Sequence, residues 1–592
     1  MGPRAGCPLQ DFLLRGVRTE WVHHATFCDF PRKDDRVTQR TGGRIIVDQL
    51  VVQGCERIFT VPGESFLAVL DALHDTPAID LVVCRQEGGA AFMACADGTL
   101  THRPGIAFVT RGPGATNASI GVHVAMQDSQ PMILFIGDVD RATRDREAFQ
   151  EIDFAAMFTP IAKWAARIDD ARRIPEYVAR AYATAMNGRP GPVVLALPED
   201  MLLDAVEAVD RPEVWRAQQQ MSPLDALEIA EAVAQAERPI AIIGGAGWNR
   251  WAADELARFS QAHGLPVVAA FRRQDALSNT FPTWAGNLGY GPNPKLLNRI
   301  RRADLILVVG ARLGEATTDG YSLISPDHPQ QRLIHIHPDP DEIGRVYAPD
   351  ELSMCANVDF AMQKLTYATE ELMPEGNVPT VAHQAAEAHA DYLTWSTPQP
   401  RPGVTLDLGL CVAAMREALP ADTIICNGAG NFSGWWHRYW RYAGPGTQLA
   451  PTAGAMGYGL PAAVAASLRY PDRSVVALAG DGDFLMNGQE LATAVQHGAR
   501  ILVLVIDNGA YGTIRMHQER AFPGRVSGTA LHNPDFAALA RAYGCWAETV
   551  EHTEDFAPAL ARAQCQPGVR LLHLKTDVEQ ITASTTLTAI RG

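Results

Sequence analysis

The sequence predicts an α/β protein made of three doubly wound parallel sheets. Short, β-branched apolar runs alternate along the chain with amphipathic helical patterns, as expected for parallel strands joined by helices. Two stretches with prolines at their ends or within them, 212–223 and 381–404, divide this alternation into three parts. Because a single hydrophobic core stops growing at roughly 250 to 300 residues, a chain of 592 residues is expected to contain several domains.

The first domain is expected at 43–211. Its strand-like runs lie at 79–83, 105–109, 132–136 and 193–197, and its helical patterns at 43–53 and 66–74. Residues 1–42 contain several arginines but only a short apolar patch, so they make a poor signal peptide. We expect them to be a mobile leader or the product of an upstream start of translation.

The second and third domains repeat the same alternation. The second is expected at 224–380, with runs at 239–245, 265–269, 304–309 and 332–336. The third is expected at 405–592, with runs at 423–426, 474–478, 501–506 and 570–574. A tryptophan-rich segment at 435–440 fits either core packing or an interface.

Composition and charge exclude several classes of protein. With 47% hydrophobic and 20% charged residues the chain is an ordinary globular protein, and no apolar run reaches the roughly 18 residues that span a bilayer. A net charge of -16 argues against a nucleic-acid surface. Ten cysteines without a Cys-x-x-Cys pair fit neither a disulfide framework nor a zinc site, which favours a reducing cytoplasm.

Two side chains that can bind Mg²⁺ follow neighbouring buried runs in the third domain. Asp481, flanked by Gly480 and Gly482, follows one run, and Asn508 ends the other. Ligands bind at the carboxyl ends of parallel strands, and Mg²⁺ prefers oxygen ligands, of which it takes only one or two from carboxylates. The sequence therefore predicts a metal–diphosphate site, followed by a helix that Asn487 caps, with Glu490 three residues on.

The Gly-Asp-Gly segment with its distal asparagine resembles the signature of thiamine diphosphate enzymes. Segment 454–463 looks like the acetolactate synthase branch of that family, and segments 85–94 and 110–117 are similar to the region of the family's catalytic glutamate. The resemblance covers about residues 43 to 580, with its blocks in the family's order. It implies thiamine diphosphate and Mg²⁺ as cofactors, and pyrimidine-binding, central and diphosphate-binding domains.

The resemblance also assigns roles to single residues. Glu87, expected in a tight turn before Gly88 and Gly89, would hydrogen-bond the cofactor's pyrimidine and help to move the thiazolium C2 proton. Asp481, Asn508 and the carbonyl of Ala510 would bind the metal, and Met456 would lie beneath the bent cofactor. The remaining implied cofactor contacts are Gly63, Gly454, Gly480, Gly482, Asp483, Tyr511 and Gly512.

Segment 148–153 and Lys163 match the synthase pattern as well. There Phe149, Gln150 and Lys163 would line the approach to the reactive carbon; the alternative explanation for them is ordinary helix amphipathicity. In acetolactate synthases the glutamate comes from one subunit and the diphosphate site from another. The resemblance therefore implies a homodimer, or a pair of such dimers, with the active site at the subunit interface.

Two segments depart from the family's pattern. Glu64 stands where the synthases usually have a glycine, and its carboxylate would repel an anionic 2-oxo acid unless it points away. Segment 310–315 keeps the arginine of the synthases, Arg312, but lacks the acidic and basic residues that follow it there. The sequence therefore leaves FAD open, with Arg312 contacting either an adenine nucleotide or solvent.

The function predicted from the resemblance is decarboxylation of a 2-oxo acid, followed by ligation of the resulting enamine to a second carbonyl compound. Such an acetolactate synthase would belong to branched-chain amino acid biosynthesis. A second hypothesis is a decarboxylase or lyase that releases an aldehyde. A third is a non-catalytic regulator that binds thiamine diphosphate or a nucleotide, against which Glu87, Asp481 and Asn508 argue.

Overall fold

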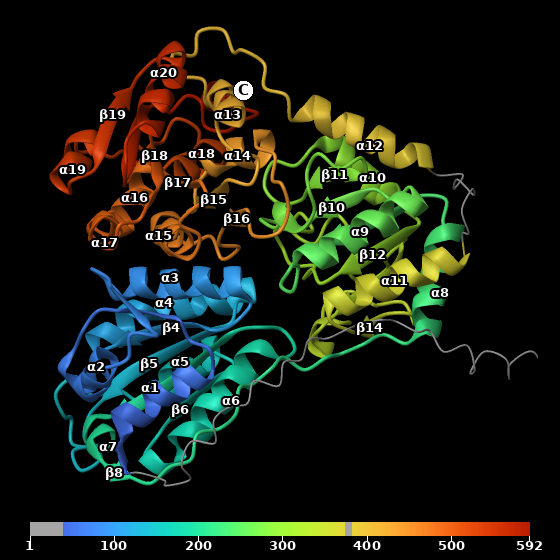
Figure 1. Ribbon diagram of the computed structural model, residues 1–592. Helices are drawn as coiled ribbons and strands as arrows, with labels where there is room; N and C mark the ends of the chain where they lie inside the picture. Colours follow the sequence, from blue (N-terminus) through green and yellow to red (C-terminus); the bar gives the residue numbers. More distant parts are fainter. Residues whose placement is uncertain (1–38, 373–381) are drawn as a thin grey trace, which may run out of the picture.

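The computed structural model describes residues 39–372 and 382–592, arranged as three α/β units that each contain a six-stranded parallel sheet (Figure 1). The predicted fold class is therefore confirmed. Most of the expected leader, residues 1–38, lies outside the described residues. Among the helices of the described part, none is long and apolar enough to cross a membrane.

The sheet of the first unit has the strand order β3-β2-β4-β5-β7-β6. Its strands are β2 (Arg57–Thr60), β3 (Asp80–Val83), β4 (Gly105–Val109), β5 (Met132–Asp138), β6 (Trp164–Arg167) and β7 (Pro192–Pro198). Its helices are α1 (Gly42–Val52), α2 (Leu67–His74), α3 (Glu87–Thr101), α4 (Pro113–Asp128), α5 (Phe154–Phe158), α6 (Ile174–Met186) and α7 (Glu199–Leu203). A short strand, β1 (Arg40–Thr41), pairs with β8 (Ala205–Val206), so ordered structure begins before residue 43.

The sheet of the third unit has the order β16-β15-β17-β18-β20-β19, which repeats the connectivity of the first. Its strands are β15 (Ile424–Asn427), β16 (Gln448–Leu449), β17 (Val475–Gly480), β18 (Leu502–Asp507), β19 (Trp546–Val550) and β20 (Arg570–Lys575). Its helices are α13 (Leu408–Ala418), α14 (Ser433–Tyr439), α15 (Gly459–Arg469), α16 (Asp481–Asn487), α17 (Glu490–Gln496), α18 (Gly512–Ala521), α19 (Phe536–Ala542), α20 (Thr553–Gln564) and α21 (Leu587–Arg591).

The central sheet is connected differently, in the order β11-β10-β9-β12-β13-β14. Its strands are β9 (Pro239–Ile243), β10 (Val267–Ala269), β11 (Trp284–Asn287), β12 (Leu305–Val309), β13 (Arg332–His337) and β14 (Met354–Cys355). The helices of this unit are α8 (Pro223–Gln235), α9 (Arg250–His263), α10 (Pro294–Arg302) and α11 (Val358–Leu372). This is the order of a doubly wound dinucleotide fold.

The stretch predicted as a second linker is largely a helix, α12 (Ala382–Trp395). It packs against the edge strand β11, where His389 Nδ1 lies 2.8 Å from the carbonyl oxygen of Trp284. The chain turns into an irregular connection only afterwards, where the prolines lie. The tryptophan-rich segment belongs to the core around α14. Its Arg438 lies over the ring of Trp395, with the guanidinium carbon 3.5 Å from the ring centroid. The segment therefore contributes both to core packing and to a contact between units.

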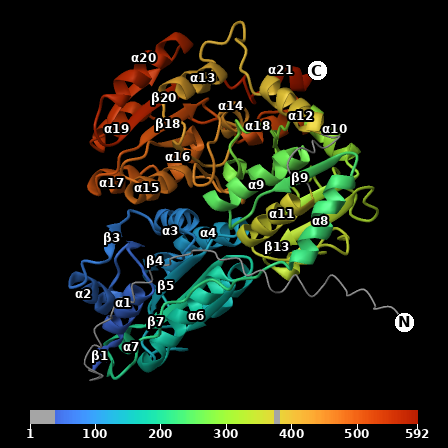
Figure 2. The same cartoon turned by 45° about the vertical axis from the view of Figure 1, so that its right-hand side comes forward.

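The first and third units lie against each other, with α3 of one facing α15 of the other in both views (Figure 1, Figure 2). Arg469 of α15 forms an ion pair with Asp97 of α3 at 2.9 Å. The buried Glu490 accepts hydrogen bonds from the backbone N–H of Arg85 at 3.1 and 3.3 Å. The two units are therefore packed through specific polar contacts as well as apolar ones.

Candidate functional site

The side chains predicted to bind a metal meet at the carboxyl edge of the third sheet. Asp481 is the first residue of α16, directly after β17, and Asn508 follows β18. The backbone N–H of Ala510 lies 3.2 Å from Asp481 Oδ2 and 3.1 Å from Asn508 Oδ1, so it can donate to both oxygens. Burial raises the pKa of Asp481 to about 6. A cation bound here would offset that cost, because it favours the charged carboxylate.

Sequence analysis missed the residues that orient Asp481. Asn533 Nδ2 donates to Asp481 Oδ2 and to Asp507 Oδ1, both at 2.8 Å. His573 Nε2 lies 2.9 Å from Asp507 Oδ2 and completes the chain of contacts. Asn533 comes from a loop remote in sequence from the Gly-Asp-Gly segment, and no local pattern marks it.

Asp483 links two loops of the cofactor region. Its Oδ1 accepts hydrogen bonds from the N–H groups of Gly457 at 2.8 Å and Ala429 at 3.0 Å, while Oδ2 is buried without a protein partner. Burial raises the pKa of this carboxyl to about 7. The turn that carries Met456 is thus fixed to the loop after β15, and Met456 itself is exposed.

Asn487 does not cap the following helix, as the sequence suggested. It is the last residue of α16, and its Nδ2 donates to the carbonyl oxygen of Gly457 at 3.0 Å. α17 begins at Glu490 without a side-chain cap. The turn at Gly457 requires a left-handed backbone with φ of 82°, which glycine adopts without strain.

The other predicted cofactor contacts of the third unit gather around the same edge. Gly482 lies so close to the ring of Tyr511 that a Cβ at residue 482 would be 2.5 Å from Tyr511 Cε1. Gly512 lies against the Asn508 amide in the same way, at 3.1 Å. Gly480 packs on Phe432, and Gly454 has a left-handed backbone and open space beside it.

This arrangement fits a metal-bound diphosphate. Mg²⁺ takes about six oxygen ligands and leaves several of them to water and phosphate. Asp481 and Asn508 offer two side-chain oxygens side by side, one charged and one neutral. Gly480 and Gly482 flank Asp481, and the Gly482 N–H donates to Asp481 Oδ1 at 2.9 Å.

Glu87 lies at the carboxyl edge of the first sheet, as the first residue of α3 rather than in the tight turn that was expected. Asn117 Nδ2 donates to Glu87 Oε2 at 2.9 Å. The second oxygen, Oε1, lies beside Gly114, where a Cβ would be 3.5 Å away. Gly63 packs tightly on Thr110, beside this group.

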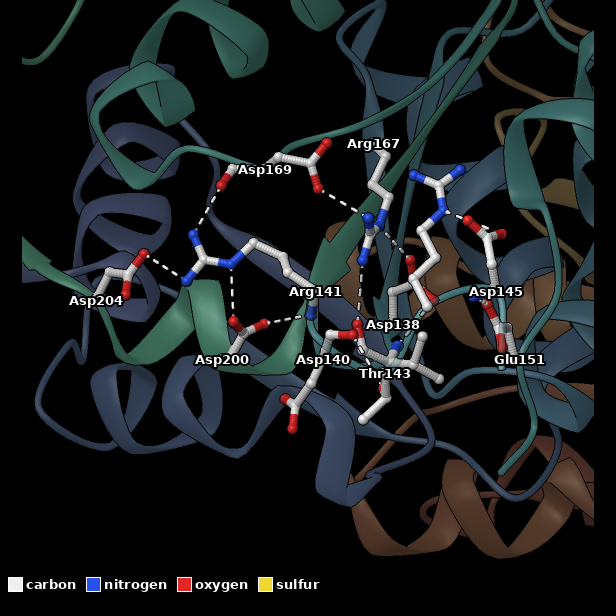
Figure 3. Close-up of polar contacts among 12 residues, drawn as sticks. Asp138, Asp140, Arg141, Thr143, Asp145, Glu151, Arg167, Asp169, Asp200 and Asp204 are labelled. Atoms are coloured by element: carbon white, nitrogen blue, oxygen red, sulfur yellow. Dashed lines mark hydrogen bonds and ion pairs between the residues drawn. The ribbon is translucent and has the colours of Figure 1, made fainter. Parts of the chain in front are cut away.

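Phe149 and Gln150 lie on a loop after β5 at the same edge. Gln150 has a left-handed backbone with φ of 64°, packs against Gly112 and leaves its buried Oε1 without a partner. Phe149 is 73% exposed. Glu151 supports the loop by accepting hydrogen bonds from the N–H groups of Asp145 at 2.7 Å and Ala148 at 2.9 Å, next to a network of arginines and carboxylates (Figure 3).

Lys163 is not brought together with these residues. It precedes β6 and therefore lies at the amino edge of the sheet, opposite to Gln150. Its Nζ donates to the carbonyl oxygen of Asn187 at 2.6 Å, and burial lowers its pKa to about 8. Its stem packs against Gly191.

Glu64 points toward Arg111, 3.4 Å away, and Arg111 also pairs with Glu199 at 2.9 Å. The carboxylate that appeared unfavourable for an anionic substrate therefore has a partner. Arg312 Nε donates to Glu342 at 3.1 Å, and its guanidinium also donates to the carbonyl oxygen of Gln127 at 3.1 Å. It thus ties the central unit to the first.

Within one chain Glu87 and the turn that carries Gly454 lie near opposite ends of α4. Gly114, beside Glu87, is near the start of α4, whereas Asp128 at its end accepts a hydrogen bond from Thr452 Oγ1 at 2.5 Å, just before Gly454. At 1.5 Å per residue, the 16 residues of α4 correspond to about 24 Å. The turn that carries Gly454 therefore lies at the end of α4 opposite to Glu87.

Three parts of the chain match families described as parts of thiamine pyrophosphate enzymes: the N-terminal TPP binding domain (residues 40–157), the central domain (227–365) and the C-terminal TPP binding domain (428–574). The chain is 30% identical over 540 residues to the acetolactate synthase large subunit of Corynebacterium glutamicum, covering 88% of this chain and 84% of that protein. It is 27% identical to the acetolactate synthase isozyme 2 large subunit of Escherichia coli (90% and 95% covered) and 28% identical to the acetolactate synthase of Bacillus subtilis (92% and 95%).

Proposed function

Because the chain belongs to the acetolactate synthase family of thiamine pyrophosphate enzymes, we infer that it is an enzyme that decarboxylates a 2-oxo acid and joins the remaining acyl unit to a second carbonyl compound. The observation that carries this function is the pair of oxygens from Asp481 and Asn508 beside the Ala510 N–H at the carboxyl edge of the third sheet. An oxygen pair in this place suits a metal-bound diphosphate.

We propose that Asp481, Asn508 and the carbonyl of Ala510 bind Mg²⁺. Asn533 keeps Asp481 oriented, and Asp483 fixes the turn of Met456 to the loop after β15. Tyr511, Gly512, Gly454 and the glycines around Asp481 would surround the rest of the cofactor. Thiamine diphosphate supplies a carbon nucleophile and an electron sink; the protein supplies binding, orientation and proton transfer.

Glu87 is proposed to hold and move a proton at the cofactor's pyrimidine. It starts α3, and Asn117 donates to one oxygen while the other lies beside Gly114. Gln150 has a buried oxygen without a partner and can accept a hydrogen bond from a reacting group, while the exposed ring of Phe149 can exclude water. Decarboxylation with ligation transfers no net electrons, so this proposal requires no flavin.

The enzyme is proposed to work as a homodimer, or as a pair of dimers, with Glu87 of one subunit facing Asp481 of another. The contacts of Glu87 with the start of α4 and of Thr452 with its end support this arrangement, because they lie at opposite ends of that helix. Each C₂ dimer would then contain two equivalent sites.

The experiment is incubation of the purified protein with thiamine diphosphate, Mg²⁺ and ¹³C-labelled pyruvate, alone and with added carbonyl compounds, followed by mass spectrometry of the products. We expect carbon dioxide together with a product in which two carbonyl compounds are joined. Stoichiometric release of acetaldehyde without any coupled product would contradict the ligase function and support the decarboxylase alternative.

A further inference from the structure

Glu490 is a fully buried carboxylate at the start of α17. Burying a charge costs free energy unless the charge is paired or hydrogen-bonded. A buried carboxylate therefore needs partners, and Glu490 finds one of them in the backbone of the first unit, although the residue itself belongs to the third. These partners indicate what the side chain holds in place.

The backbone just before α3 donates to this carboxylate. The N–H of Arg85 lies 3.1 Å from Glu490 Oε1 and 3.3 Å from Oε2. Thr493 Oγ1, one turn further along α17, donates to Oε2 at 2.5 Å. The N–H groups of Arg85 and Gln86 and the Thr493 hydroxyl each lower the pKa of Glu490, although burial is the larger effect and raises it. The carboxylate thus connects α17 to the start of α3.

The start of α3 has room for this carboxylate because Gly89 lacks a side chain. A Cβ at residue 89 would lie 2.6 Å from Glu490 Oε1. The N-terminus of a helix presents unpaired N–H groups and a partial positive charge, and both favour a carboxylate. Gln86, the N-cap of α3, accepts a hydrogen bond from the N–H of Gly89 at 3.0 Å. Side chains from two units therefore stabilise the start of this helix together.

The C-terminal end of α17 holds the same connection between β3 and α3. The backbone N–H of Val83, the last residue of β3, donates to Nε2 of His497, the C-cap of α17, at 3.0 Å. Gln496 Oε1 accepts a hydrogen bond from the guanidinium of Arg85 at 2.5 Å. The chain that leads into α3 is therefore fixed to α17 at both Val83 and Arg85.

Glu87 directly follows this fixed connection. It is the first residue of α3, so the place of its carboxyl depends on where that helix begins. Asn117 donates to one oxygen at the tip of the side chain, whereas Glu490 holds the backbone from which the side chain starts. A misplacement of about 1 Å can cost a catalytic group roughly 100-fold in rate. Loss of the contact with Glu490 should therefore be felt at Glu87.

We propose that Glu490 is a positioning residue, which fixes the start of α3 and thereby holds Glu87 in place for proton transfer with the cofactor. This inference rests on the proposed function of Glu87. Glu490 acts through the backbone of Arg85 rather than on the cofactor itself. Asp481, the proposed metal ligand, begins a different helix, α16. Proton transfer should therefore depend on Glu490 much more than cofactor affinity does.

The first test follows amide hydrogen exchange in the full chain without cofactor. Glu490→Gln replaces one carboxylate oxygen by an NH₂ group, which cannot accept a hydrogen bond from Arg85. Deuterium uptake of the segment 85–89, measured by mass spectrometry, should become faster by about 10-fold. Val495→Ala, at a 41% exposed position of α17, is the matched control and should leave this uptake unchanged. Thr493→Val removes only one donor to the carboxylate, so it should show a smaller increase, and it serves if Glu490→Gln does not fold.

The second test is a double-mutant cycle on the enzyme loaded with thiamine diphosphate and Mg²⁺. Glu490→Gln should slow exchange of the cofactor's C2 proton, followed by NMR, by about 10- to 100-fold. Cofactor affinity, measured by calorimetry, should stay within about 2-fold of the wild type. In a chain that already carries Glu87→Gln, the same change should alter C2 exchange by less than about 2-fold, because a residue that acts only through Glu87 has no further effect there.

Each outcome decides the proposal. C2 exchange at the wild-type rate in Glu490→Gln, unchanged deuterium uptake at 85–89, or equal slowing with and without Glu87→Gln would overturn the positioning role of Glu490. A loss of cofactor affinity as large as the loss of C2 exchange would overturn it as well, since that pattern indicates a general structural role. C2 exchange at the wild-type rate in Glu87→Gln would instead show that the proposed function of Glu87 is wrong.

Discussion

The first and third sheets share one strand order but carry different chemistry at their carboxyl edges. At the third sheet the acidic groups are buried: Asp481 and Asp483 lie among glycines and backbone N–H groups, where few charges can be tolerated. At the first sheet Glu64 and Glu199 are partly exposed and pair with Arg111. The fold sets the place of a site, whereas the residues at the strand ends set what it binds.

The largest effect is expected at the buried edge. Asp481→Ala removes the only full negative charge that we assign to the metal, so thiamine diphosphate and Mg²⁺ should lose affinity together, by more than about 100-fold. Isothermal titration calorimetry measures both. The control variant Asp472→Ala, changed at an exposed position of the same unit, should bind thiamine diphosphate and Mg²⁺ as tightly as the wild type does. Unchanged cofactor affinity in Asp481→Ala would mean that the diphosphate binds elsewhere.

Glu87→Gln should slow proton transfer while leaving cofactor affinity unchanged. The amide keeps the shape of the side chain and its contact with Asn117, but it cannot move a proton. We expect exchange of the cofactor's C2 proton, followed by NMR, to slow by about 10²- to 10⁴-fold, with cofactor affinity close to that of the wild type. Exchange at the wild-type rate would exclude Glu87 from proton transfer.

Replacing Asp128 tests the contact between the first and third units beside the turn that carries Gly454. Burial raises its pKa from 3.8 to about 6, although Thr452, Ala453 and Arg272 act in the opposite direction. Because the folded pKa is the higher one, its stabilising effect is complete below pH 3.8 and is lost as the pH rises through about 6.

Asp128→Asn stays neutral and can still accept from Thr452. Between pH 4 and pH 7 the wild type should therefore lose up to about 3 kcal/mol of stability relative to Asp128→Asn. Urea unfolding of both proteins across this range measures the difference. Parallel pH profiles would show that Asp128 titrates normally in the folded protein.

The smallest kinetic effect is expected for Lys163→Met. A lysine at the amino edge of the first sheet, bonded to Asn187, cannot guide a donor to the opposite edge. Its replacement should leave the donor KM within about 2-fold while lowering thermal stability, since the hydrogen bond to Asn187 is lost. A clear rise in donor KM would instead support the resemblance, which places Lys163 at the approach to the reactive carbon.

The features predicted correctly from the sequence are those that depend on residues adjacent in the chain. The positions of Asp481 and Asn508 at strand ends could be predicted, because each residue directly follows a buried apolar run. Asn533 could not, because it reaches Asp481 from a loop that tertiary packing brings close. α12 was not predicted because Pro398, Pro400 and Pro402 follow it closely and indicate a linker, although its own alanine-rich sequence favours a helix. Asn487 failed as a cap because the carbonyl of Gly457 binds its side chain.

The central claim is that Glu87 at the first sheet and Asp481 at the third sheet act in one site but come from different subunits. Glu87→Gln and Asp481→Ala chains should each be inactive alone. Mixed by co-expression or by reversible dissociation, they form heterodimers in which one of two sites contains both native residues. Random equal mixing should then restore about a quarter of wild-type activity. No recovery in a mixture whose heterodimers are verified by native mass spectrometry would contradict the claim.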